Sequence, residues 1–320
     1  MVYFQTKLRS WINPNNLKFN YLSDNPNAIS LLKANLDKIN WELLSQNPNA
    51  ISILEANIDN INWFYLSGNP SAIELLKVNQ DKINWVKLSE NPNAISLLEA
   101  NQDKIIWDYL LFNPNGIELL KKNLNKIKWN TLSENLNAIS LLEANFDKIN
   151  WKYLSINPNA IHLLEQNQDK INWNYLSGNY NAIHLLKKNQ HKINWDNISA
   201  NKNKKAIEIL EQNKDKINWH LLSSNPEAIE LLEANQDKIN WCILSLNPNA
   251  IELLKNNKDK IDCEMLMSNP SIFTYDYEGM KDTKADLNEE VIAMALHPKR
   301  IFRLISEYGE EEIYDIYLDD

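Results

Sequence analysis

The apolar positions of this chain recur with a period of 22 residues. Residues 151–172, WKYLSINPNAIHLLEQNQDKIN, show the pattern and serve as a reference unit. Within this unit Ala160, Ile161 and Leu164 fall three and four residues apart, the spacing that places side chains on one face of an α-helix. About eleven such units fill residues 19–262, and a broken unit follows. A fixed period of this kind is the sequence signature of a repeat protein.

A large side chain opens nearly every unit. Tryptophan recurs at a spacing of 22 residues, with one step of 24, between Phe19 at the start of the series and Cys263 at its end: Trp41, Trp63, Trp85, Trp107, Trp129, Trp151, Trp173, Trp195, Trp219 and Trp241. A buried tryptophan hides about 150–250 Å² of surface. We therefore expect the tryptophan column to be a main part of the core.

Each unit predicts two short helices. Asn157 and Pro158 suit the cap and first position of a helix of roughly nine or ten residues. Asn167 suits a left-handed cap at the end of that helix. Asn150 is the expected cap of a second, shorter helix that begins at Trp151. We interpret the three asparagines of each unit as backbone caps; the alternative is an amide ladder that recognises a ligand.

The fold class predicted from these units is an all-α solenoid. A leucine-rich repeat also has a period near 22 residues, but its strand would turn Lys152, and Glu42 and Asp108 in other units, inward at a high cost. Helices this short are unstable alone, so each unit must bury its apolar side against its neighbours. Layers about 10 Å apart predict a rod or superhelix on the order of 100 Å long.

The repeat pattern divides the chain into three parts. Residues 1–18 are expected to form an N-terminal cap, residues 19–273 the helical array, and residues 274–320 an acidic helical module that covers the open end of the solenoid. The array is irregular at 201–207, where NKNKKAI replaces NPNAI; this predicts a bulge or a change of superhelix direction, although a neutral insertion is equally compatible.

Charge is concentrated in the last part. Residues 274–320 contain thirteen acidic and five basic residues, so their net charge of −8 leaves about −1 of the total −9 for the rest. A nearly neutral array does not favour nucleic-acid binding. The basic residues Lys299, Arg300 and Arg303 are candidates for contact with an acidic partner, or else pair with glutamates of the same module.

The variable positions indicate where a partner would bind. Tyrosine stands two residues after the large opening residue in several units, and these candidate partner-binding residues are Tyr21, Tyr65, Tyr109, Tyr153 and Tyr175. A row of tyrosines is typical of protein-recognition surfaces. Tyrosines that merely cover grooves between helices are an equally good interpretation.

No catalytic or metal-binding motif is present, so we expect neither enzymatic activity nor a cofactor. His162 and His184 occupy equivalent positions, but further metal ligands are missing. No apolar run is long enough to span a membrane, and no signal peptide is evident, so we expect no membrane partner and no secretion. Two cysteines do not make a disulfide framework, which favours a reducing compartment.

The unit N-P-N-A-I-x-L-L-x-x-N-x-D-K-I-N-W-x-x-L-S resembles tandem repeats in proteins of giant nucleocytoplasmic DNA viruses of the mimivirus kind. The segments Tyr275-Asp276-Tyr277 and His297-Pro298-Lys299-Arg300 are similar to a C-terminal segment that recurs in such proteins. The resemblance covers nearly the whole chain and implies a viral protein, placed in the cytoplasm of an infected cell or in the virion. It supplies no catalytic residues.

These features together predict a non-enzymatic scaffold or host-interaction factor that binds a host or viral protein through an extended solenoid surface. The alternative is a structural virion component or a self-assembling rod. A hydrolase or transferase site hidden at 201–207 or in the last module is a third, weaker hypothesis.

Overall fold

The computed structural model describes residues 6–276, and the prediction of an all-α solenoid is confirmed there. Residues Arg9–Phe273 form one compact unit, and residues 6–8 and 274–276 belong to a second. A two-stranded sheet joins β1 (Thr6–Leu8) to β2 (Phe273–Tyr275).

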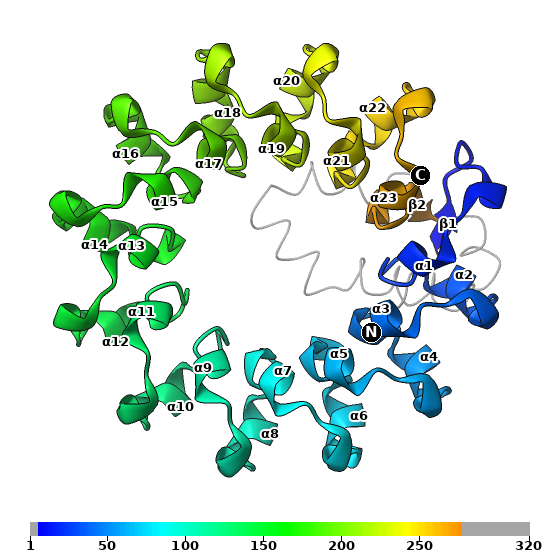
Figure 1. Cartoon of the computed structure of the whole chain (residues 1–320), viewed down its shortest axis with the longest axis horizontal. Helices are drawn as coiled ribbons and strands as arrows, with labels where there is room; N and C mark the ends of the chain where they lie inside the picture. The colour runs from blue at the N-terminus through cyan, green and yellow to red at the C-terminus, as the bar shows by residue number, and fades with distance from the viewer. Residues whose placement is uncertain (1–5, 277–320) are drawn as a thin grey trace, which may run out of the picture. The chain divides into compact units, whose positions relative to one another are not determined.

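Two layers of helices make up the repeat array. The inner layer holds the odd-numbered helices and the outer layer the even-numbered ones (Figure 1). The inner helices are α1 (Phe19–Leu22), α3 (Trp41–Gln46), α5 (Trp63–Gly68), α7 (Trp85–Glu90), α9 (Trp107–Leu110), α11 (Trp129–Leu132), α13 (Trp151–Leu154), α15 (Trp173–Gly178), α17 (Trp195–Ser199), α19 (Trp219–Ser223), α21 (Trp241–Ser245) and α23 (Cys263–Met267). The outer helices are α2 (Ile29–Lys33), α4 (Ile51–Glu55), α6 (Ile73–Val78), α8 (Ile95–Glu99), α10 (Ile117–Lys121), α12 (Ile139–Glu143), α14 (Ile161–Gln166), α16 (Ile183–Lys188), α18 (Lys204–Glu211), α20 (Ile229–Glu233) and α22 (Ile251–Lys255).

Short 3₁₀ helices connect these layers. One group precedes an inner helix: η1 (Pro14–Asn16), η2 (Leu36–Lys38), η3 (Ile58–Asn60), η5 (Gln80–Lys82), η6 (Gln102–Lys104), η7 (Leu124–Lys126), η8 (Phe146–Lys148), η10 (Gln168–Lys170), η11 (Gln190–Lys192), η12 (Lys214–Lys216), η14 (Gln236–Lys238) and η16 (Lys258–Lys260). A second group begins at the repeat proline: η4 (Pro70–Ala72), η9 (Pro158–Ala160), η13 (Pro226–Ala228), η15 (Pro248–Ala250) and η17 (Pro270–Ile272). The outer α-helices are therefore shorter than the predicted nine or ten residues, because the turn at the proline adopts 3₁₀ or turn geometry.

The array closes on itself. Position 1 denotes the large residue that opens each repeat, and the twelve inner helices define twelve repeats. The buried asparagine at position 7 donates its side-chain N–H groups to the backbone of the preceding repeat; Asn47, for example, bonds to the carbonyls of Ser23 and Asn25, both at 3.1 Å. Asn25 of the first repeat makes the same bonds to Met267 and Asn269 of the last, at 2.8 and 3.0 Å.

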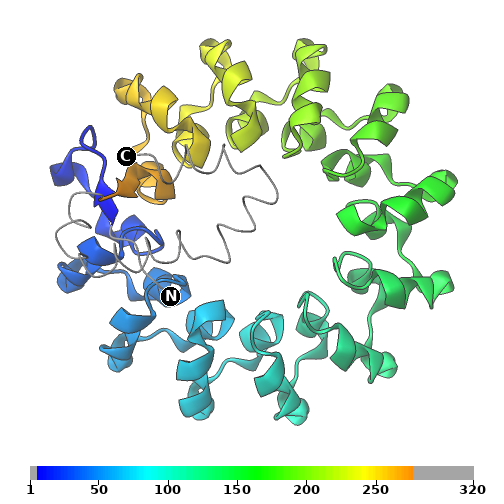
Figure 2. The ribbon, with the colours of Figure 1, turned by 180° about the vertical axis from the view of Figure 1, so that it is seen from behind.

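The asparagine ladder thus runs through all twelve repeats and back to its start. The ribbons of residues 9–273 correspondingly follow a ring in both views (Figures 1 and 2). The expectation of a rod or open superhelix about 100 Å long is wrong, because the same stacking that joins internal repeats also joins the first to the last. From residue 277 onward, the predicted C-terminal module of residues 274–320 lies outside the described residues.

The twelfth repeat is built from both ends of the array. It stops at position 11, Phe273, where β2 begins in place of the outer helix that starts at this position in most other repeats. Residues 13–18 precede Phe19 at the register of positions 17–22, and η1 matches the other 3₁₀ helices in that register. Arg9 fastens the two segments, since its backbone N–H donates to the Ile272 carbonyl at 2.9 Å and its Nε to the Ser271 carbonyl at 2.7 Å. The first residues therefore complete the last repeat.

Leucine and alanine, rather than tryptophan, form the fully buried column. Leu154, Ala160 and Leu164 of the reference unit have no exposed surface, and their equivalents in the other repeats are buried in the same way. The tryptophans at position 1 are only half-buried. In several repeats a lysine at position 20 covers the indole; Lys104 Nζ lies 4.8 Å from the centre of the Trp85 ring. The expectation that the tryptophan column is a main part of the core therefore holds only in part, because the indoles are half-buried where leucine and alanine are fully buried.

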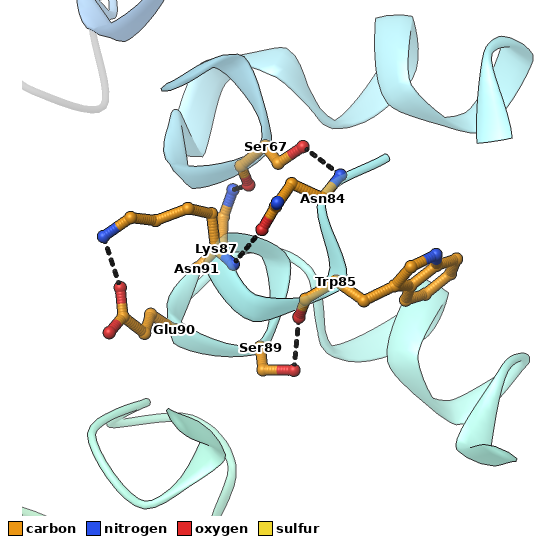
Figure 3. A network of polar contacts seen from close by, with 7 residues as sticks. All are labelled: Ser67, Asn84, Trp85, Lys87, Ser89, Glu90 and Asn91. Carbon is orange, nitrogen blue, oxygen red and sulfur yellow. Dashed lines mark hydrogen bonds and ion pairs between the residues drawn. The ribbon is translucent and has the colours of Figure 1, made fainter. Parts of the chain in front are cut away.

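Asparagine and serine satisfy the backbone, as the capping interpretation predicts, but they also join repeats. Figure 3 shows one such joint, in which Asn84 caps α7 by accepting from the Lys87 N–H at 3.0 Å. The Asn84 N–H in turn donates to Ser67 Oγ of the previous repeat at 2.9 Å. The predicted left-handed cap is wrong: Asn167 has φ −132° and ψ 51°, and its side chain instead donates to the Leu163 carbonyl at 2.9 Å.

Candidate protein-binding surface

Each inner helix has one side that faces the outer layer and an opposite side that faces away from it. Leucine at position 4 and, in most repeats, serine at position 5 are buried, so helical geometry leaves positions 2, 3 and 6 on the opposite side. In Figure 3, Lys87 and Glu90 at positions 3 and 6 extend from the side of α7 opposite Trp85. We call the surface formed by positions 2, 3 and 6 of all twelve repeats the inner face.

All five tyrosines predicted to bind a partner lie on the inner face. They sit at position 3 of five inner helices: Tyr21, Tyr65, Tyr109, Tyr153 and Tyr175. Tyr109 is 38% exposed, and the other four are half-buried. Only Tyr153 and Tyr175 stack on each other, edge to face, with 5.9 Å between ring centres. The structure thus gathers the row on one surface but spreads it over separate repeats.

Tyr21 has a role that the sequence did not indicate. Its hydroxyl donates to Glu264 Oε2 of α23 at 2.9 Å, so this residue joins the first repeat to the last. The hydrogen bond and the negative charge of Glu264 raise the pKa of Tyr21 above its ordinary value. Tyr21 is therefore a closure residue as well as a candidate contact residue.

Sequence reasoning missed four exposed apolar side chains of the inner face. These are Phe64, Phe112, Ile156 and Leu246, which are 43%, 53%, 40% and 37% exposed. They occupy positions 2 and 6, where most repeats carry polar or small residues. Large apolar residues at variable positions were the available signal, but only the fold shows that positions 2 and 6 share a surface with position 3.

Cations already lie over aromatic rings of the inner face. Lys152 Nζ is 5.5 Å from the centre of the Tyr153 ring and 5.2 Å from that of Tyr175. Lys87 Nζ lies 5.5 Å from the Phe64 ring centre and 3.2 Å from Glu90 Oε2. These contacts fix long side chains between neighbouring repeats and leave much of the aromatic surface accessible.

The two histidines considered as metal ligands have other partners. His162 Nε2 lies 2.7 Å from Glu143 Oε1, and His184 Nε2 lies 2.7 Å from Glu165 Oε1, each across one joint between repeats. Within residues 6–276 no three histidine, cysteine or acidic side chains gather closely enough to hold a metal ion. The recurring serine is likewise occupied, because Ser155 Oγ donates to the Trp151 carbonyl at 2.7 Å and accepts from the Asn172 N–H at 2.9 Å.

The irregular segment 201–207 does not interrupt the array. Asn201 keeps one ladder bond, to the Ser177 carbonyl at 2.9 Å, and Asn225 keeps both of its own. The two extra residues enter before and within α18, which has eight residues where the other outer helices have five or six. The two extra residues therefore lengthen a helix of the outer layer, and the asparagine ladder stays continuous.

Three predicted contact residues, Lys299, Arg300 and Arg303, lie outside the described residues. Across residues 6–276, no helix combines the length and the hydropathy needed to cross a bilayer.

Searches of family models, curated proteins and solved structures found no match to this chain.

Proposed function

We propose that this chain is a non-enzymatic scaffold that binds a host or viral protein on the inner face of its closed array. The observation that carries the proposal is the group of large apolar side chains left accessible on that face, among them Phe64, Tyr109 and Phe112. Aromatic side chains of this kind supply most of the binding energy at protein interfaces. A viral origin, and a place in an infected cell or virion, rest on the resemblance of the repeat unit alone.

A closed array supports binding for a physical reason. Each repeat is held on both sides by the asparagine ladder, including the first and the last. The inner face is therefore ordered before a partner arrives, and less conformational entropy is lost on association. The ring also argues against the self-assembling rod, because within residues 9–273 the stacking faces of both terminal repeats are already in contact with each other.

The test compares two double variants in affinity capture from infected cells followed by mass spectrometry. Phe64→Ser/Phe112→Ser changes the inner face, and Val78→Ser/Leu124→Ser changes apolar residues of similar or greater exposure elsewhere. We expect a protein that the wild type and the Val78/Leu124 variant recover and the Phe64/Phe112 variant loses, with direct binding after purification. Equal recovery by both variants would contradict binding at the inner face.

A further inference from the structure

A groove of about 370 Å³ lies in the outer layer between α18 and α20. One wall is a single face of α18, since Lys204, Ile207, Glu208 and Glu211 follow each other at intervals of three, one and three residues. The opposite wall is formed by η13 and α20. Lys204 lies in the turn that the insertion adds to α18, so the groove depends on the one break in the 22-residue period. We call it the α18 groove.

The α18 groove has an apolar base and an acidic rim. Ile207 and Leu231 at its base are only 7% and 4% exposed. Four glutamates line it, of which Glu208 pairs with Lys187 of the preceding repeat at 2.8 Å. Among the described residues no basic group lies within ion-pair distance of the remaining three, which are Glu211, Glu227 and Glu230.

The repeat register shows that a cation is missing at this joint. Position 15 of one outer helix pairs with position 12 of the next at other joints, as in Glu143 with His162 and Lys187 with Glu208, at 2.7 and 2.8 Å. Between α18 and α20 the same two positions hold Glu211 and Glu230. This joint therefore has two negative charges at the positions where Lys187 and Glu208 form an ion pair.

At other joints with two glutamates at these positions, a lysine of the same helix pairs with one of the two glutamates. Glu74 follows Glu55 in this register, and Lys77 of its own helix pairs with it at 2.8 Å. In α20 the position equivalent to Lys77 is Glu233, so Glu230 has no such partner. Of the described residues that line the groove, Lys204 is the one basic residue and makes no ion pair with these glutamates, so most of the acidic charge of the α18 groove is left for a ligand to balance.

The form of the groove selects the kind of cation. Its carboxylates do not converge into a group that could hold a metal ion. A long side chain suits it better, because the methylene stem of arginine or lysine can lie on the apolar base while the charged end reaches the separated carboxylates. We propose that the α18 groove binds an arginine- or lysine-bearing peptide segment of a partner protein. This site is separate from the inner face and does not depend on it.

The experiment measures binding of a fluorescein-labelled hexapeptide, with two arginines flanked by leucines, to the full chain by fluorescence anisotropy at low salt. Glu211→Gln/Glu230→Gln removes two groove charges, and Glu55→Gln/Glu99→Gln removes two exposed charges at position 15 of other repeats. We expect saturable binding that weakens about tenfold in the first variant and less than about twofold in the second. A peptide with glutamates in place of the arginines should not bind.

Two results would overturn the proposal: equal weakening in both double variants, which would indicate nonspecific attraction, or no saturable binding to the wild type below about 1 mM. Removing like charges from a surface does not threaten folding, so circular dichroism should show unchanged helix content in both variants. Binding by the Phe64→Ser/Phe112→Ser variant should equal that of the wild type, which separates this site from the inner face.

Discussion

Replacing Asn25 with alanine tests whether the array is closed in solution. Asn25 is fully buried, donates to the carbonyls of Met267 and Asn269, and accepts from the Asn27 N–H at 3.0 Å. The matched internal position is Asn91, which is 1% exposed. It donates to two carbonyls of the preceding repeat at 3.1 and 3.0 Å and accepts one N–H at 3.0 Å. The two substitutions therefore remove the same bonds at different joints.

The expected cost follows from these three bonds. A buried neutral hydrogen bond contributes about 1 kcal/mol, and unsatisfied groups left behind add to the loss, so each alanine variant should lose about 3 kcal/mol of unfolding free energy. At the closure joint two of the three bonds exist only if the first repeat meets the last. With an open array, Asn25→Ala would lose only the local bond to Asn27, about 1 kcal/mol.

The assay is urea unfolding at constant temperature, followed by circular dichroism for helix and by tryptophan fluorescence. Repeat arrays depend on nearest-neighbour contacts, so the comparison between the two variants is more informative than either value alone. We expect equal shifts of the midpoint for Asn25→Ala and Asn91→Ala. A shift for Asn25→Ala of one third or less of that for Asn91→Ala would refute closure.

Three further predictions concern the closure and the core. Above about pH 10 the wild type should lose more stability than Tyr21→Phe, because the pKa of Tyr21 is raised in the folded state: the contribution of Tyr21 is complete below the unfolded pKa and disappears as pH rises through the folded value. Thermal melts of both proteins between pH 8 and 11 measure this, and parallel pH profiles would contradict it. Ser155→Ala should cost about 1–2 kcal/mol because its hydroxyl donates within its own helix and accepts across a joint, whereas Ser224→Ala, with one exposed bond, should cost less than about 0.5 kcal/mol in urea unfolding. Leu88→Ala should cost about 2–5 kcal/mol and at least as much as Trp85→Ala, since only the leucine is fully buried; a larger loss for Trp85→Ala would restore tryptophan as the dominant core residue.

The sequence identified one part of the candidate surface and missed another. Tyr109 and its equivalents stood out because tyrosine recurs at one position. Phe64 and Phe112 were not identified, because the sequence alone does not show which variable positions share a face with the tyrosine position. The α18 groove was signalled by the irregular segment at 201–207, but the like charges of Glu211 and Glu230 become meaningful only when neighbouring outer helices are placed side by side.

The sequence by itself determined the unit of this protein. A period of 22 residues, an N-cap asparagine before Trp151 and an Asn-Pro before most outer helices specify short paired helices, because capping and hydrophobic spacing act within a few residues. The charged residues that a strand would turn inward, such as Lys152, also excluded a strand-based repeat. The hydrophobic spacing fixed which residues of a unit must be buried, although not that leucine would be covered more completely than tryptophan.

Only the tertiary structure decided that the units form a ring. The rotation between neighbouring repeats is small, about 30° if twelve repeats share a full turn, and it arises from the summed packing of many side chains at each joint. No single residue encodes that angle, so periodicity alone is compatible with a rod, a superhelix or a ring. Closure is possible because residues 13–18 supply positions 17–22, which the last repeat lacks. It also depends on Asn25, which donates to the carbonyls of Met267 and Asn269 just as an internal asparagine donates to the carbonyls of the repeat before it.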